Sequence, residues 1–159
     1  MTTTYEVKDG ARTLQFDGTL LGKSSSRKRH SSRWIEFEIY RTTSGSYVIS
    51  RIGVSITFHS ATCYLVSKYG LTDELVSTLD AHAFACDSCN PTLELPIVFP
   101  EKNRYWAQVC DEPSAVIDAL YKYGDGGARY LTWVARQVLE EAADNDDKID
   151  SAYRFERIP

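Results

Sequence analysis

The chain has 159 residues, of which 43% are hydrophobic and 25% are charged, and its net charge at pH 7 is -4. This length suits one domain whose core does not depend on a metal for all its stability. The acidic balance argues against a protein whose whole surface attracts phosphate, and no apolar run approaches the roughly 20 residues that span a bilayer. We therefore expect a cytoplasmic protein without membrane contact.

The first sixty residues show the period-two alternation that is typical of β-strands. Apolar and polar side chains alternate at 13–17, again at 34–40 and again at 52–58, and the step Asp17-Gly18 indicates a tight turn. His59 then lies at the end of a strand. These features predict an N-terminal antiparallel sheet built from hairpins.

A polar segment, GKSSSRKRHSSRW at 22–34, interrupts this pattern. Among its serines it carries six basic side chains: Lys23, Arg27, Lys28, Arg29, His30 and Arg33. Such side chains donate hydrogen bonds to phosphate oxygens, with an affinity that falls as salt rises. Four of them are our candidate nucleic-acid contacts: Arg27, Lys28, Arg29 and Arg33. The alternative is a solvated hairpin loop without a ligand.

Four side chains that bind metals lie in the middle of the chain: His59, Cys63, Cys86 and Cys89. Zinc takes such donors in a tetrahedron, and a C-x2-C pair supplies two thiolates from one tight turn. In a reducing compartment such a pair more often binds metal than forms a disulfide. We therefore predict a structural zinc ion that stabilises the subregion 59–92. His82 is an alternative to His59, because it also precedes a cysteine by four residues.

A zinc enzyme would need an open position on the metal for water. Zinc deaminases carry H-x-E and, further downstream, P-C-x-x-C. This chain has Ala61 in place of the Glu and Ala85 in place of the Pro, and Cys63 supplies a fourth ligand that fills the coordination sphere. A closed site is favoured over a zinc-dependent hydrolase, which would need one ligand off the metal and a carboxylate such as Asp87 or Glu94 in reach.

The C-terminal part changes to a helical period. Asp111 and Pro113 predict the start of one helix, and a second helix is predicted over 128–143. The second helix has an apolar stripe that suits packing on the sheet: Leu131, Val134, Ala135, Val138, Leu139 and Ala142. We interpret 124–127 as the turn between these helices, 144–150 as a solvated connection and 152–158 as a final edge strand.

The fold class is therefore α+β. An N-terminal antiparallel sheet, a central zinc-bearing insert and two C-terminal helices packed on the sheet form a single domain spanning 1–159. Cys110 is expected to be a buried apolar side chain. Five aromatic residues are expected in the core or at its margin: Tyr105, Trp106, Tyr121, Tyr123 and Tyr130.

On an ideal helix Trp133 lies opposite the apolar stripe, on the same face as Arg129 and Arg136. Aromatic and Arg side chains dominate binding hot spots, so these three are our candidate partner-binding residues. The alternative is that a neighbouring segment covers Trp133.

The leading hypothesis is a non-catalytic, zinc-stabilised binding or adaptor module. It makes protein-protein contacts through the Trp133 face and the zinc-bearing segment. One alternative is a nucleic-acid-binding accessory protein that uses the basic loop 23–33, and a second alternative is a zinc-dependent hydrolase.

Overall fold

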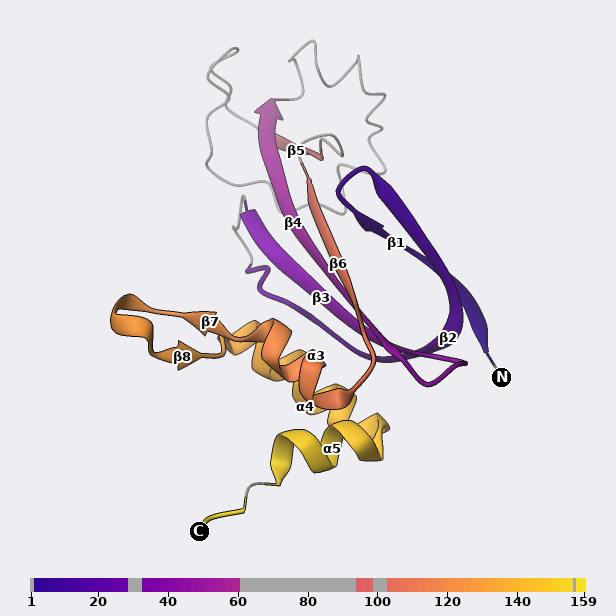
Figure 1. The fold of residues 1–159 in the computed structure, drawn as a ribbon. Coiled ribbons are helices and arrows are strands. Elements are labelled where there is room, and N and C mark those ends of the chain that lie inside the picture. The colour runs from indigo at the N-terminus through magenta and orange to yellow at the C-terminus, as the bar shows by residue number, and fades with distance from the viewer. Residues whose placement is uncertain (1, 29–32, 61–93, 99–102, 156) are drawn as a thin grey trace. The chain divides into compact units, whose positions relative to one another are not determined.

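The computed structural model describes residues 2–28, 33–60, 94–98, 103–155 and 157–159 (Figure 1). Of residues 55–60 and 94–98 it describes the backbone. Contacts within the chain group it into two compact units, a larger one of residues 1–26, 35–53 and 104–159 and a smaller one of residues 27–34 and 54–103. The single-domain organisation stays a prediction.

A curled antiparallel sheet forms the frame of the larger unit. Its strands are β1 (Thr3–Asp9), β2 (Arg12–Ser25), β3 (Arg33–Thr42), β4 (Tyr47–Ser60) and β6 (Arg104–Cys110), in the order β1-β2-β3-β4 with β6 paired to β4. The sheet curls until β1 approaches β6, where the Gly10 amide donates to the Tyr105 carbonyl over 2.8 Å. In the smaller unit, β5 (Glu94–Val98) pairs with Ile56–Ser60 of β4.

Both faces of this sheet are apolar. On the inner face, the rings of Tyr5, Phe16 and Tyr40 lie 4.7 to 5.9 Å apart between centroids. On the outer face, Phe37 and Ile39 belong to a core that the C-terminal helices complete. The predicted alternation in β3 is confirmed, and the curl of the sheet is why its second face is also buried.

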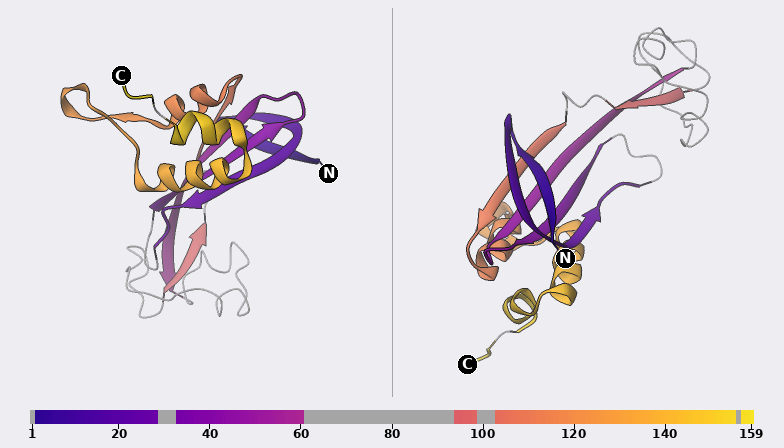
Figure 2. Two further views of the ribbon diagram at one scale, coloured as in Figure 1. Left: turned by 90° about the horizontal axis from the view of Figure 1, so that it is seen from below. Right: turned by 90° about the vertical axis from the view of Figure 1, so that its right-hand side faces the viewer.

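Three helices cover the outer face, as Figure 2 shows from two further sides. They are α3 (Pro113–Leu120), α4 (Trp133–Asn145) and α5 (Asp147–Arg154), and a short hairpin of β7 (Lys122–Tyr123) and β8 (Arg129–Tyr130) joins the first two. An antiparallel sheet followed by packed helices confirms the predicted α+β class. No helix in the described part of the chain is long and apolar enough to cross a membrane.

The second predicted helix is placed too early in the sequence. It begins at Trp133 and not at 128, because the Thr132 side chain caps it by accepting a hydrogen bond from the Ala135 amide over 3.3 Å. The preceding residues form β8, so 124–127 turns a hairpin and does not join two helices directly.

The predictions for the C-terminal end are wrong. The acidic run 144–150 is not a solvated connection, and 152–158 does not return as an edge strand, because α5 occupies Asp147–Arg154. Ile149 on this helix is fully buried and belongs to the outer core. Burial of one apolar side chain with a strong N-terminal cap outweighs the polar composition of the segment.

That cap is Asp146, a buried carboxylate that joins the helices to the sheet. One oxygen accepts the amides of Lys148 and Ile149, at 2.9 and 3.0 Å, and also the Tyr47 hydroxyl at 3.1 Å. The other oxygen pairs with the Arg41 guanidinium at 2.8 Å. Burial, with the nearby Asp146 charge, raises the pKa of Tyr47 to about 12. Asp146 thus ties β3 and β4 to the start of α5.

Strand β2 and helix α4 approach each other closely at Gly22. A Cβ at this position would lie 2.8 Å from the Val138 carbonyl oxygen and 2.9 Å from the Ala142 amide nitrogen. Next to this contact, the Ser24 hydroxyl donates to the Val134 carbonyl at 2.7 Å. The absence of a side chain at Gly22 is therefore what lets backbone meet backbone here.

Candidate functional site

The hairpin between α3 and α4 is a small ordered arm (Figure 1). Its strands are held by the pairs Lys122 with Tyr130 and Tyr123 with Arg129. At its tip the Gly124 amide donates to the Ala128 carbonyl over 2.8 Å. Gly126 and Gly127 have φ angles of 80° and 83°, which other residues rarely adopt, so this turn depends on glycine. We call residues 122–130 the arm.

Arg129 holds the base of the arm against α3. Its guanidinium lies 4.0 Å from the centroid of the Tyr121 ring, and Nη1 lies 3.3 Å from a carboxylate oxygen of Asp118. Both members of this ion pair are largely exposed, so the pair contributes little to stability. Its effect is to orient the arm.

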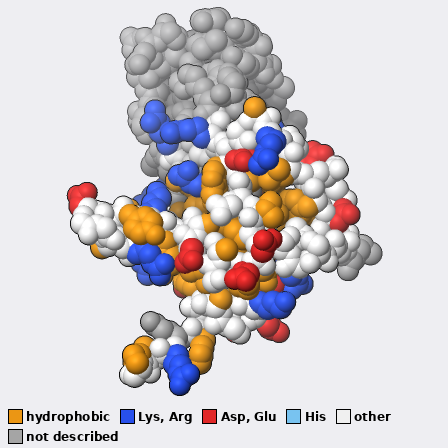
Figure 3. Space-filling model, in the orientation of Figure 1, with side chains coloured by type: hydrophobic (Ala, Val, Ile, Leu, Met, Phe, Trp, Pro, Cys, Tyr) orange, Lys and Arg blue, Asp and Glu red, His pale blue; other side chains and the backbone are white. Residues whose placement is uncertain are grey.

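Three large aromatic side chains are exposed on the arm and just after it. Tyr123 is 71% exposed, Tyr130 is 47% exposed and Trp133 is 62% exposed. The pairing places Tyr123 and Tyr130 on opposite faces of the arm, since residues directly opposite in an antiparallel pair share a face. Figure 3 shows hydrophobic side chains on this projection with Lys or Arg side chains beside them. The arm therefore offers apolar contact area on both faces.

The three predicted partner-binding residues are placed differently from one another. Trp133 is exposed at the first turn of α4, as helix geometry predicts, and Arg136 is exposed one turn later. Arg129 does not share their helix face, because it lies on β8 before the helix begins. It belongs to the arm instead.

Two aromatic residues of this surface were not predicted. Tyr123 and Tyr130 were expected in the core or at its margin, and they are exposed. Tyr105, Trp106 and Tyr121 are partly buried, as expected. The sequence does hold one signal for the difference, since both exposed tyrosines flank a glycine-rich turn within short strands.

Only one of the predicted zinc ligands lies in the described part of the chain. His59 is in β4, where its backbone pairs with Leu95 of β5. Cys63, Cys86 and Cys89 lie outside the described residues, as does the alternative ligand His82. Among the residues that are described, no three His, Cys, Asp or Glu side chains are grouped to hold a metal. The zinc site stays a prediction.

Cys110 is buried, as predicted from the sequence. Burial raises the pKa of its thiol, which favours the protonated form. It therefore packs in the outer core as a small apolar side chain.

The basic loop is described on either side of residues 29–32, which include Arg29. Arg27, Lys28 and Arg33 are exposed, in the smaller unit. The Arg27 guanidinium lies 4.6 Å from the centroid of the Trp34 ring, and Trp34 is buried. Stacking on an indole orients the guanidinium.

Comparisons with protein-family models, curated proteins and solved structures find no match to this chain.

Proposed function

We propose that the protein is a non-catalytic binding or adaptor module that contacts a protein partner through the arm and Trp133. The observation that carries this proposal is the exposure of Tyr123, Tyr130 and Trp133 around one projecting hairpin. Tyr and Trp are enriched among the residues that dominate binding energy, because they bury large areas at low entropic cost. In this proposal His59, Cys63, Cys86 and Cys89 bind a structural zinc ion that stabilises the central segment.

Two exposed cations near the arm favour an acidic partner segment, while the carboxylate of the arm itself, Asp125, lies in the turn at its tip. Lys122 on the arm and Arg136 on α4 are exposed, and within the described part of the chain no carboxylate pairs with either. Asp118 already pairs with Arg129. A partner that places apolar side chains against the tyrosines and carboxylates near these two cations would complement both features.

The test begins with capture of partners from the source cell by the full-length chain. Wild type is compared with the triple variant Tyr123→Ser, Tyr130→Ser, Trp133→Ser and with a control variant, Val109→Thr, Ile158→Ser. Both control sites are exposed hydrophobic residues outside the arm. Circular dichroism first confirms that each variant folds.

We then purify any protein that wild type and the control variant capture and the triple variant does not. Its Kd is measured for each of the three chains. We expect at least a tenfold weaker Kd for the triple variant, about 1.4 kcal/mol. If every captured protein binds all three chains equally, the arm is not the binding surface.

The second candidate function is nucleic-acid binding through the basic loop. The exposure of Arg27, Lys28 and Arg33 within one short segment favours it. Binding to single- and double-stranded DNA and RNA is measured across a salt series, with wild type and with Arg27→Gln, Lys28→Gln, Arg29→Gln. Unchanged binding after neutralisation would exclude this loop, since phosphate contacts by these cations set the salt dependence.

A further inference from the structure

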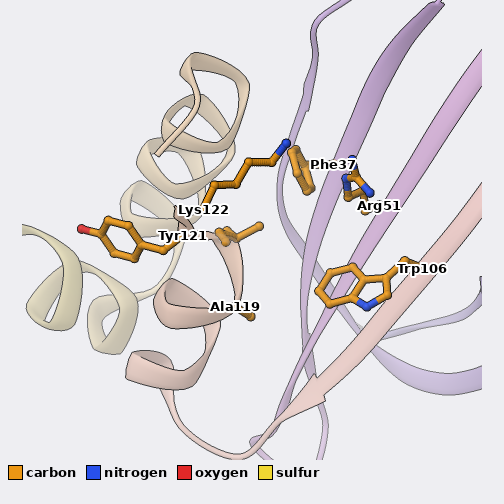
Figure 4. Close-up of a pocket in the computed structure, with 7 residues that line it drawn as sticks. Phe37, Arg51, Trp106, Ala119, Tyr121 and Lys122 are labelled. Atoms are coloured by element: carbon orange, nitrogen blue, oxygen red, sulfur yellow. The ribbon is translucent and has the colours of Figure 1, made fainter. Parts of the chain in front are cut away.

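A concave feature lies in the larger unit, between the C-terminal end of α3 and the outer face of the sheet (Figure 4). It is a cavity of about 260 Å³, open to solvent on one side. Four apolar side chains line it: Phe37, Trp106, Ala119 and Leu120. Tyr121 and two cations, Arg51 and Lys122, also line it.

The fold explains why a cavity forms at this place. Arg51 on β4 and Trp106 on β6 are directly paired across the sheet, so they share its outer face. Helix α3 ends at Leu120, and the chain continues extended through Tyr121. The Tyr121 ring points away from the sheet, while the Lys122 side chain reaches back toward Phe37 and Arg51 (Figure 4). The Tyr121 ring therefore leaves the space next to the Trp106 indole unfilled.

Among the described residues that line this cavity, both charged side chains are cations and none is an Asp or Glu. Neither Arg51 nor Lys122 forms an ion pair with another described residue. Arg51 is partly buried. Two like charges that converge on a partly apolar space repel each other, and a bound anion would turn this repulsion into attraction.

We propose that this cavity binds a small aromatic carboxylate. Lys122 belongs both to the arm and to this cavity, and the other lining residues lie outside the arm. The ring of the ligand packs between Trp106 and the apolar side of α3 at Ala119, since aromatic rings favour offset stacking. The carboxylate meets Arg51, whose planar guanidinium matches its two oxygens, and Lys122 adds a second positive charge. The cavity volume is just under the range of about 300–1,000 Å³ that holds drug-sized ligands, so a ligand with a single ring or two fused rings fits.

The test uses the full-length chain and two probes of the same shape, 2-naphthoate and the neutral 2-naphthamide. Binding is measured by calorimetry, and its place is read from the indole N–H signal of Trp106 in a ¹H–¹⁵N spectrum assigned with Trp106→Phe. We expect 2-naphthoate to shift this signal and to bind at least tenfold more tightly than 2-naphthamide.

Three variants and one control separate charge from shape. Arg51→Gln and Lys122→Gln should each weaken 2-naphthoate at least tenfold while 2-naphthamide is unaffected. Ala119→Leu should block both probes by filling the space. Lys148→Gln, which removes an exposed cation of α5 outside the cavity, should change nothing.

The proposal is overturned if 2-naphthoate leaves the Trp106 signal in place. It is also overturned if both probes bind equally, or if Lys122→Gln and Ala119→Leu bind 2-naphthoate as Lys148→Gln does. Circular dichroism of each variant distinguishes a lost site from a lost fold, and Lys122 is exposed, so its substitution leaves the core intact.

Discussion

Asp146→Ala tests the junction between sheet and helices. The substitution removes the acceptor that caps α5, and loss of such a cap costs about 0.5–2 kcal/mol. It also leaves the buried Tyr47 hydroxyl without the oxygen that it donates to, which costs about 1–3 kcal/mol. The Arg41 side chain is 44% exposed, so loss of its ion pair adds only about 0–1 kcal/mol. We expect the free energy of unfolding to fall by about 1.5–6 kcal/mol in total.

The assay is urea unfolding followed by circular dichroism, with Asp147→Ala as the matched control. Asp147 is the next residue along, is exposed, and contributes only its charge in the first turn of α5, about 0.3–1 kcal/mol. Tyr47→Phe combined with Asp146→Ala should cost less than the sum of the two single substitutions, because the hydroxyl and the carboxylate share one hydrogen bond. If Asp146→Ala costs no more than Asp147→Ala, or if the double variant is additive, the junction does not join helix to sheet as described.

Three further outcomes are expected. Gly22→Ala should lower the free energy of unfolding by about 1–3 kcal/mol, because its Cβ would meet the α4 backbone. The control is Gly53→Ala, whose Cβ would lie 3.6 Å from its nearest neighbour, the Arg104 Cβ, and which should change this free energy by less than about 1 kcal/mol. Similar values for the two variants would contradict the close approach at Gly22. Burial, and then the neighbouring charge of Glu36, raises the pKa of Glu38, so this group's contribution to stability is full below its unfolded pKa and is lost as pH rises through the raised folded pKa. The difference in urea midpoint between Glu38→Gln and wild type should therefore be more favourable to the variant at about pH 7 than at about pH 4. A difference that stays the same at both pH values would refute this. Native mass spectrometry should find zinc bound to the wild-type chain and none bound to Cys86→Ser. Chelation of zinc should lower the unfolding midpoint of the wild-type chain. A wild-type chain without bound metal would contradict the predicted zinc site.

The strands could be predicted because their signal is local. Alternation across 34–40 predicts β3, and its antiparallel pairing with β2 is confirmed. The tight turn predicted at Asp17-Gly18 is wrong, because both residues lie inside β2. The alternation does not predict the curl of the sheet. Tyr40 and Glu38 face inward because β1 comes round to β6, and that contact joins residues almost a hundred positions apart.

The C-terminal helix was missed because the burial of its cap is tertiary, although the cap itself is local: Asp146 accepts the amides of Lys148 and Ile149. Asp146 stands in a run of acidic and polar residues that indicates a solvated segment. Its burial depends on Tyr47 and Arg41, which come from strands about a hundred residues earlier. A local pattern does not record a distant hydrogen-bond donor.

The candidate surface was predicted in part. Exposure of Trp133 follows from the period of α4, which the apolar stripe makes plain. Tyr123 and Tyr130 were missed because each lies in a strand of two residues, too short for any period to show. Because β8 has only two residues, the predicted helix began too early and included Arg129, which lies on β8.

If the arm and Trp133 bind a protein partner, loss of the Trp133 side chain alone weakens the affinity for that partner. The purified partner is titrated with wild type, with Trp133→Ser and with Ile158→Ser, which removes an even more exposed apolar side chain near the C-terminus. We expect a Kd at least tenfold weaker for Trp133→Ser and an unchanged Kd for Ile158→Ser. Equal affinities for all three chains would contradict it.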